Sequence, residues 1–237
     1  RLIDSAVNYE NEGAVGEAVR RSGIPRDEIL VTSKLPGRHH AYADAVTCVH
    51  ESLYRMQLDH IDLYLIHWPL PRVDRYVEAW QALVDLQRDG LLRSIGVSNF
   101  LPEHLDRIIA ETGVTPAVNQ IELHPYFPQE LQRQVDAERG IVTEAWSPLG
   151  RAGEVMRDPV VTGIAQAHGR TPVQVVLRWH LQLGTLPLPK AASASRQLEN
   201  LSVFDFELDA AQVAAITALG RPDGRLFGAD PATHEEF

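Results

Sequence analysis

Four side chains in the first third of the sequence could together protonate a carbonyl oxygen. They are Asp4, Tyr9, Lys34 and His67. A buried lysine needs a counter-charge to stay protonated, and Asp4 can supply it. An ammonium held near a phenol favours the phenolate. We therefore expect Lys34 to lower the pKa of Tyr9 and to make it a general acid near neutral pH.

The remaining parts of such a reaction can also be read from the sequence. His67 could donate a hydrogen bond to a carbonyl oxygen on which negative charge develops. None of these side chains can deliver a hydride, so a cofactor is implied. The segment Gly13-Ala14-Val15-Gly16 lacks the G-x-G-x-x-G spacing and lies within a helical pattern. Neither a Rossmann dinucleotide site nor a phosphate-binding P-loop is therefore supported.

Short apolar or β-branched runs alternate with helical patterns along the chain. Apolar residues three and four apart predict helices over 42–56 and 76–86. Repeated βα units at roughly 30-residue spacing favour a parallel sheet, either doubly wound or closed as a barrel. The predicted strands are Leu2–Asp4, Ile29–Lys34, Ile61–His67, Arg93–Ser98, Ala117–Glu122, Val142–Ser147 and Thr185–Lys190.

Nearly every predicted strand ends in a residue that an apolar core would not select. In a parallel barrel the carboxyl ends of the strands meet at one face, where active sites lie. A structural hydrogen bond could explain any one of these residues, but it explains the whole set poorly. The set consists of Asp4, Lys34, His67, Ser98, Asn99, Gln120, Trp146, Ser147 and Lys190.

The seven predicted strands are one fewer than a closed barrel of this kind requires. The chain starts within a strand at Arg1-Leu2-Ile3-Asp4, with no initiator Met. If the sheet of this α/β protein closes as a barrel, we therefore expect one βα unit to precede Arg1. No low-complexity linker divides residues 1–237, which predicts a single domain, and 220–237 is predicted to be an irregular tail.

Composition limits the classes of partner. The chain has 22 basic and 32 acidic residues, a net charge of −10, which argues against a general nucleic-acid binder or a binder of anionic membranes. It contains neither a signal peptide nor an apolar run long enough to cross a bilayer. Its single cysteine, Cys48, fits a cytoplasmic protein and is expected to pack against the core from a helix. The adjacent His39 and His40 lack accompanying ligands, so no metal site is predicted.

The sequence resembles the aldo-keto reductase family along essentially its whole length. Two features resemble those of the prokaryotic branch that contains the 2,5-diketo-D-gluconic acid reductases. They are the short loop between Trp68 and Trp80 and the segment Ala145–Leu149. Four ordered segments carry the family resemblance, namely Arg1–Glu12, Leu65–Pro69, Gly96–Phe100, and Leu188–Lys190 with Arg196, Glu199 and Asn200.

The resemblance implies an α/β protein with a (β/α)8 TIM-barrel fold, whose first β-hairpin and first βα unit are missing from this chain. It further implies a catalytic tetrad of Asp4, Tyr9, Lys34 and His67. It also implies NADP(H) as cofactor, with NADPH preferred to NADH. Ala191 stands where many members carry Ser or Thr, and the loss of one hydroxyl contact is expected to weaken that preference by about 1 kcal/mol. The substrate implied is a small carbonyl compound, and relatives of this kind are often monomers.

The cofactor and substrate roles that the resemblance implies fall on strand ends and on the segment after the last strand. By this resemblance, the nicotinamide carboxamide would be bound by Ser98, Asn99 and Gln120, and its ring would stack on Trp146. The pyrophosphate would lie along Ser147, Leu149 and Gly150, the 2′-phosphate would be bound by Lys190 and Arg196, and the adenine would contact Glu199 and Asn200. The substrate pocket would be formed by Trp68 beside His67.

Two other functions remain open at this point. Lys34 at a strand end could form a Schiff base, as in class I aldolases, although the Asp4-to-Tyr9 spacing and the nicotinamide motifs argue against it. The chain could also be a non-catalytic NADP-binding protein of the same fold. The intact tetrad argues against that second alternative, and the missing first βα unit argues for it.

Overall fold

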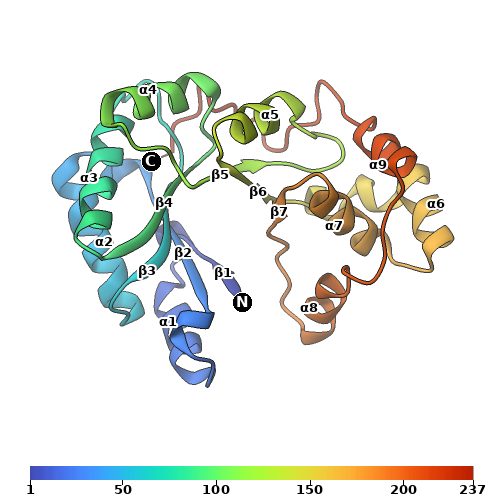
Figure 1. The fold of residues 1–237 in the computed structure, drawn as a ribbon, viewed down its shortest axis with the longest axis horizontal. Coiled ribbons are helices and arrows are strands. Elements are labelled where there is room, and N and C mark those ends of the chain that lie inside the picture. The colour runs from blue at the N-terminus through green and yellow to red at the C-terminus, as the bar shows by residue number, and fades with distance from the viewer. Residues whose placement is uncertain (237) are drawn as a thin grey trace. The chain divides into compact units, whose positions relative to one another are not determined.

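The sheet carries its strands in the order in which they occur in the sequence. The structure is a computed structural model that describes residues 1–236, and Figure 1 traces the chain. Each strand pair for which a register is defined runs parallel. The strands are β1 (Leu2–Asp4), β2 (Leu30–Leu35), β3 (Ile61–Ile66), β4 (Leu92–Ser98), β5 (Val118–Glu122), β6 (Val142–Trp146) and β7 (Leu186–Pro187).

These strands confirm the predicted parallel α/β arrangement, and most of their ends agree within one residue. The last strand is the exception, because β7 has two residues where the pattern predicted six. Pro187 and Pro189 have no backbone N–H to donate, which limits how far sheet pairing can extend there.

Helices follow the strands, and the two whose bounds were predicted begin where expected. The helices are α1 (Glu12–Arg21), α2 (Tyr42–Met56), α3 (Tyr76–Arg88), α4 (Pro102–Thr112), α5 (Glu130–Glu138), α6 (Pro159–His168), α7 (Pro172–Gln182), α8 (Ala194–Leu201) and α9 (Ala210–Thr217). No helix within residues 1–236 is both long and apolar enough to span a bilayer.

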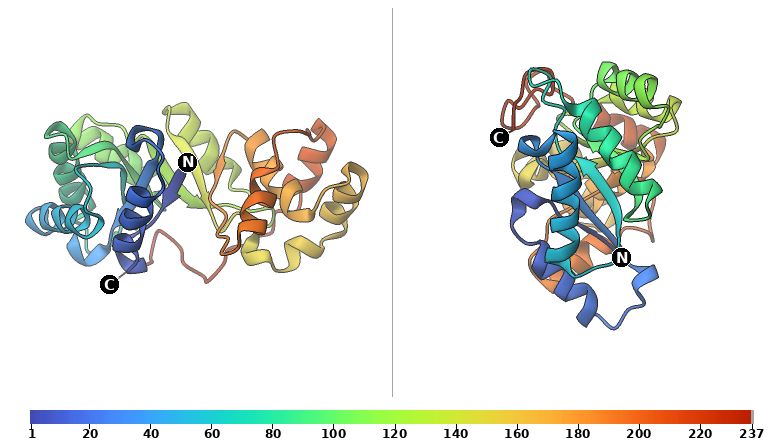
Figure 2. Two further views of the ribbon diagram at one scale, coloured as in Figure 1. Left: turned by 90° about the horizontal axis from the view of Figure 1, so that it is seen from below. Right: turned by 90° about the vertical axis from the view of Figure 1, so that its left-hand side faces the viewer.

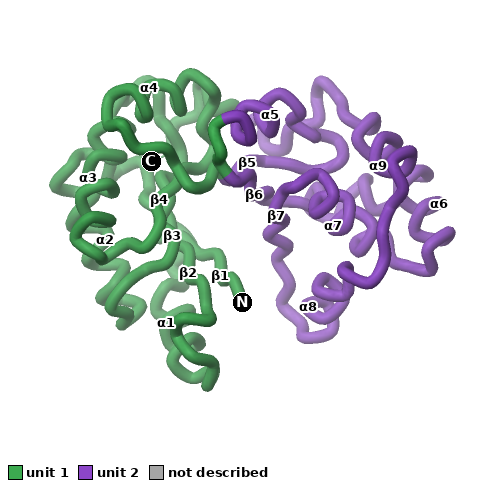
Figure 3. Tube along the Cα trace, in the orientation of Figure 1, with its two compact units in different colours: residues 1–119, 139–141, 230–237 green, residues 120–138, 142–229 purple. Residues whose placement is uncertain are grey.

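The chain divides into two compact units, shown in Figure 3. Unit 1 comprises Arg1–Asn119, Arg139–Ile141 and Asp230–Phe237, of which Phe237 lies outside the described residues. Unit 2 comprises Gln120–Glu138 and Val142–Ala229. The last segment of the sequence therefore belongs to the same unit as the first.

In unit 1, helices α2 and α3 pack side by side against the strands (Figure 2). Trp80 on α3 is buried, and Cys48 on α2 is buried as the sequence predicted. The buried hydroxyl of Tyr64 on β3 lies 3.0 Å from Ser52 Oγ on α2, so the one polar group of this ring is hydrogen-bonded.

Unit 2 has its own apolar core, formed by strands β5 and β6 and helices α6, α7 and α9. The fully buried Trp179 on α7 donates its indole N–H to Thr217 at 3.0 Å. Helix α7 begins with a capping box in which Thr171 and Gln174 satisfy each other's backbone N–H groups.

Helix α1 approaches the end of α2 very closely at one glycine. A Cβ added at Gly16 would lie 1.9 Å from the backbone oxygen of Met56, whereas one added at Gly13 would lie 3.5 Å from the oxygen of Arg55. Only a residue without a side chain therefore fits at Gly16, and α1 is held against α2 at this point.

Replacing Gly16 should consequently destabilise unit 1, because α1 must move away from a rigid backbone. We expect Gly16→Ala to lower the free energy of unfolding by about 3 kcal/mol, measured by urea denaturation. Gly13→Ala, on the same helix but exposed, is the matched control and should raise stability by up to about 1 kcal/mol through helix propensity. Equal effects of the two changes would contradict the close approach.

Candidate active site

The parallel strands of unit 1 bring the four predicted catalytic side chains to one end of the sheet. Asp4 is the last residue of β1, Lys34 is the last but one of β2, and His67 directly follows β3. The register pairs Asp4 with Thr32 and Lys34 with Leu65. Tyr9 closes a single 3-10 turn, Val7–Tyr9, between β1 and α1.

Lys34 is held by three oxygen atoms. Its side chain is fully buried, and its Nζ lies 2.7 Å from both carboxylate oxygens of Asp4 and 2.7 Å from the backbone oxygen of Ser5. An ammonium has three protons to donate, so these partners match its full capacity. The arrangement fixes the lysine in its charged form beside the end of β1.

Tyr9 and His67 complete the cluster. Nζ of Lys34 lies 5.1 Å from the centroid of the Tyr9 ring, and the rings of Tyr9 and His67 meet edge to face with centroids 6.1 Å apart. Tyr9 is 49% exposed, so its ring is open to an approaching molecule. The structure thus gathers all four residues that were singled out from the sequence.

The predicted lowering of the Tyr9 pKa is wrong in direction. Partial burial of the ring, together with the negative charges of Asp4 and Glu236, raises the pKa of Tyr9 from its ordinary value of 10.0 to about 12. The sequence argument treated Lys34 as an unpaired positive charge. In the structure its charge is balanced by Asp4 at 2.7 Å, so little net attraction for a phenolate remains.

Ser98 and Asn99 lie at the end of β4, next to His67. The amide nitrogen of Asn99 donates to the backbone oxygen of His67 and to Ser98 Oγ, both at 3.0 Å. Asn99 adopts a left-handed backbone conformation with φ of 62°, which asparagine tolerates better than most residues. Its side chain thereby links the ends of β3 and β4.

In unit 2, the predicted cofactor residues lie at the ends of β5 and β6 and in the turn that follows. Gln120 is buried on β5 and donates to the carboxylate of Glu144 at 2.9 Å. Trp146 ends β6 and is half-buried. Ser147, Leu149 and Gly150 follow it, with positive φ at Ser147 and Gly150.

The remaining predicted cofactor residues surround the start of α8. Ser193 caps this helix, and its hydroxyl accepts the backbone N–H of Arg196 at 3.4 Å. Lys190 and Arg196 are exposed, while Glu199 and Asn200 lie half-buried one turn further along. Within residues 1–236 no acidic side chain forms an ion pair with Lys190 or Arg196.

Sequence reasoning missed the part of unit 1 that the last residues supply. His234 packs against the buried Trp68 with ring centroids 4.2 Å apart and the rings tilted, and Glu235 accepts the backbone N–H of Arg72 at 2.9 Å. The segment was predicted to be an irregular tail, and none of these contacts was predicted. It has no hydrophobic period, and the sequence carries no signal that would place it beside the tetrad.

Glu236 extends this segment into the tetrad. Its carboxylate accepts the side-chain amide of Asn8 at 2.8 Å and the backbone N–H of Gly37 at 3.4 Å. It also lies 2.8 Å from Nδ1 of His67, although no aligned hydrogen bond joins the two atoms. Partial burial opposes ionisation, but these donors outweigh it and hold the pKa of Glu236 below its ordinary value.

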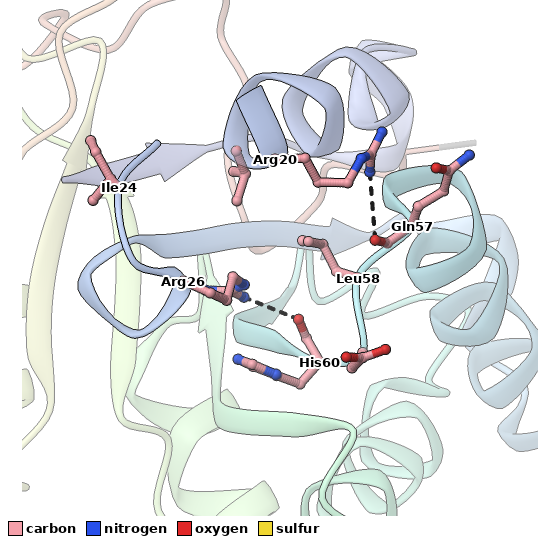
Figure 4. Close-up of a pocket in the computed structure, with 8 residues that line it drawn as sticks. Arg20, Ile24, Arg26, Gln57, Leu58 and His60 are labelled. Atoms are coloured by element: carbon pink, nitrogen blue, oxygen red, sulfur yellow. Dashed lines mark hydrogen bonds between the residues drawn. The ribbon is translucent and has the colours of Figure 1, made fainter. Parts of the chain in front are cut away.

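A cavity of about 270 Å³ opens at the opposite ends of these strands (Figure 4). Arg20 and Arg26 line it, but both guanidinium groups bind the protein itself. Arg20 donates to the oxygens of Met56 and Gln57, and Arg26 to the oxygen of His60 and the carboxylate of Asp62. None of the tetrad residues lines this cavity, and its arginines hold neighbouring segments of the protein together. Within residues 1–236 no cluster of three or more His, Cys, Asp or Glu side chains could hold a metal.

Comparison with known proteins decides the family. The family model described as "Aldo/keto reductase family" matches residues 1–221. The chain belongs to the aldo/keto reductase family. It is 56% identical over 237 residues to 2,5-diketo-D-gluconic acid reductase B of Corynebacterium sp., covering 100% of this chain and 85% of that protein. It is 44% identical over 232 residues to methylglyoxal reductase DkgA of Escherichia coli, covering 98% and 83%.

Solved structures give the same assignment. The apo form of Gox0644 is 46% identical to this reductase, with a TM-score of 0.94 over 100% of this chain and 85% of that one. A variant of Gox0644 in complex with NADPH also gives a TM-score of 0.94 at 46% identity, over 99% and 84%.

The raised pKa of Tyr9 makes a testable difference at alkaline pH. Because the neutral phenol is favoured, Tyr9 should remain protonated where a free tyrosine is half ionised. We expect the tyrosinate absorbance of the wild type and of Tyr9→Phe to coincide up to about pH 11 and to diverge only above it. A difference of one tyrosinate with a midpoint near 10 or below would contradict the assignment.

Proposed function

We propose that this chain reduces a small aldehyde or ketone to the alcohol, with NADPH as the hydride donor and Tyr9 as the proton donor. One observation carries the proposal, namely the buried Lys34–Asp4 pair beneath the open ring of Tyr9 and next to His67. The cluster lies in a chain of the aldo/keto reductase family, whose solved members include NADPH complexes.

The tetrad residues take separate parts in this proposal. Bound NADPH supplies the hydride for the carbonyl carbon. Tyr9 keeps its proton at neutral pH and gives it to the carbonyl oxygen as negative charge develops there. The Lys34–Asp4 pair holds the ends of β1 and β2 together behind the Tyr9 ring and so fixes where the phenol is presented. His67 donates to the same oxygen and orients the substrate.

The cofactor roles are proposed residue by residue from the family resemblance, and local features of each unit support them. Ser98 and Asn99 lie beside His67. Ser147 and Gly150 after Trp146 adopt positive φ, a turn conformation whose backbone N–H groups could bind a pyrophosphate. Lys190 and Arg196 present two cations near the capped start of α8, which suits a 2′-phosphate. Gln120, Ser147, Leu149, Gly150, Glu199 and Asn200 keep the roles that the resemblance implies.

We also propose the finer description of the molecule. Parallel strands hydrogen-bonded in sequence order are consistent with a (β/α)8 barrel that functions as one domain. Trp68 is proposed as a wall of the substrate pocket, because it lies next to His67 in sequence. A monomer in the cytoplasm remains our prediction from the family and from the single cysteine.

The Schiff-base alternative is disfavoured by the state of Lys34. A nucleophilic lysine must lose a proton and reach the substrate. Lys34 is fully buried and donates to three oxygens, which holds it protonated. The non-catalytic alternative is disfavoured because every tetrad residue is present and the four lie together.

Tyr9→Phe should separate catalysis from cofactor binding, because it removes only the transferable proton. We expect the NADPH-dependent reduction of simple aldehydes to fall by at least about a hundredfold. The dissociation constant for NADPH, measured by quenching of tryptophan fluorescence, should change by less than about twofold. Loss of NADPH binding together with turnover would show that Tyr9 is structural.

Arg196→Ala should act on one cofactor only. Removal of a guanidinium from the 2′-phosphate should raise the dissociation constant of NADPH roughly thirtyfold and leave that of NADH almost unchanged. Arg170→Ala is the control, since Arg170 pairs with Asp205 away from the start of α8. Equal weakening of NADPH and NADH by Arg196→Ala would remove this residue from the phosphate site.

A further inference from the structure

Two buried polar side chains lie against each other on neighbouring strands of unit 2. Gln120 on β5 and Glu144 on β6 are each 2% exposed, and Nε2 of Gln120 donates to Oε2 of Glu144 at 2.9 Å. Leaving a buried amide N–H without its acceptor costs free energy. Glu144 therefore favours one of the two orientations that the planar amide of Gln120 can adopt.

The alternation of side chains along the strands determines the face on which this pair lies. Ile121 on β5 and Ala145 on β6 belong to the apolar core of unit 2. Since successive side chains of a strand point to opposite faces, Gln120 and Glu144 lie on the other face of the sheet. Trp146, two residues beyond Glu144, lies on that face as well and is half-buried. The pair therefore shares a face with the side chain proposed to stack on the nicotinamide ring.

The direction of this hydrogen bond decides which kind of group Gln120 can bind. A glutamine amide has one end that donates and one end that accepts, and both are attached to the same carbon atom. Because Nε2 faces Glu144, the acceptor Oε1 is turned away from Glu144. A nicotinamide carboxamide carries an NH2 group that needs such an acceptor, whereas the reversed glutamine amide would present a second donor to it.

We propose that Glu144 is a positioning residue for the cofactor, which orients the amide of Gln120 so that Oε1 accepts the carboxamide N–H of the nicotinamide. The inference rests on the proposed function, in which Gln120 binds this carboxamide. Glu144 acts through Gln120 and does not itself touch the cofactor. Without Glu144 both orientations of the Gln120 amide become accessible, and only one of them accepts the carboxamide.

A purely structural role of the pair makes a different prediction. If the hydrogen bond only joined β5 to β6, its loss would disturb the cofactor residues that follow these strands and weaken every nicotinamide cofactor alike. The 3-acetylpyridine analogue of NADP+ separates the two roles, because a methyl group replaces the NH2 group of its carboxamide. The analogue has no N–H to donate there, so its binding does not depend on Oε1 of Gln120.

The test measures the dissociation constants of NADP+ and of its 3-acetylpyridine analogue by quenching of tryptophan fluorescence. Glu144→Met keeps the length of the side chain and removes the acceptor. We expect this variant to bind NADP+ roughly fivefold more weakly than the wild type, the loss of about one hydrogen bond, and to bind the analogue within about twofold of the wild type. Glu144→Gln keeps an oxygen that can accept from Gln120 and should bind NADP+ as the wild type does.

Glu122→Met is the matched control. Glu122 is also buried on this face of β5, but its carboxylate contacts His124 and accepts the backbone N–H of Leu226. This change should leave the ratio of the two dissociation constants as it is in the wild type. Glu144→Val, whose β-branched side chain suits a strand, takes the place of Glu144→Met if the methionine variant does not melt cooperatively.

Equal weakening of NADP+ and the analogue by the loss of Glu144 would overturn the inference, and so would an unchanged affinity for NADP+. A wild type that binds the two equally would overturn it too, because the carboxamide N–H would then have no acceptor, but NADPH-dependent reduction would still stand. Failure of the proposed function gives another result, namely a wild type that binds neither NADP+ nor NADPH.

Discussion

The candidate site depends on one buried ammonium. Nζ of Lys34 is surrounded by the two carboxylate oxygens of Asp4 and the backbone oxygen of Ser5, each at 2.7 Å. Burying either charge without its partner would cost free energy of folding. The pair therefore holds the end of β1 against β2. The same ammonium lies beneath the ring of Tyr9. The interaction that fixes the strand ends therefore also sets the charge beside the proposed proton donor.

A second consequence concerns the protonation of Tyr9. With Lys34 balanced by Asp4, the negative charges nearby and partial burial raise the pKa of the phenol to about 12. Tyr9 then holds its proton over the neutral range and releases it only to a stronger base, such as an oxygen on which negative charge develops after hydride transfer. The site is arranged to retain a proton until the reaction requires it.

The strand pattern, the helices over 42–56 and 76–86, and the clustering of the tetrad were predictable, because hydrophobic period and parallel topology determine them. The sign of the Tyr9 shift was not, since it depends on whether Lys34 is already paired in space. Glu236 was not predictable either. It is far from His67 in sequence, and an irregular segment carries no period from which its position could be derived.

The central claim is that Asp4 and Lys34 act as one unit behind Tyr9, and a double-mutant cycle on the hydride-transfer step tests it directly. Single-turnover rates are measured for Asp4→Asn, Lys34→Met and the double variant, each checked for folding and for NADPH binding. If the two residues act as one unit, the single-turnover rate of the double variant should be no lower than that of the slower single variant. Losses that multiply, as for independent residues, would contradict the claim.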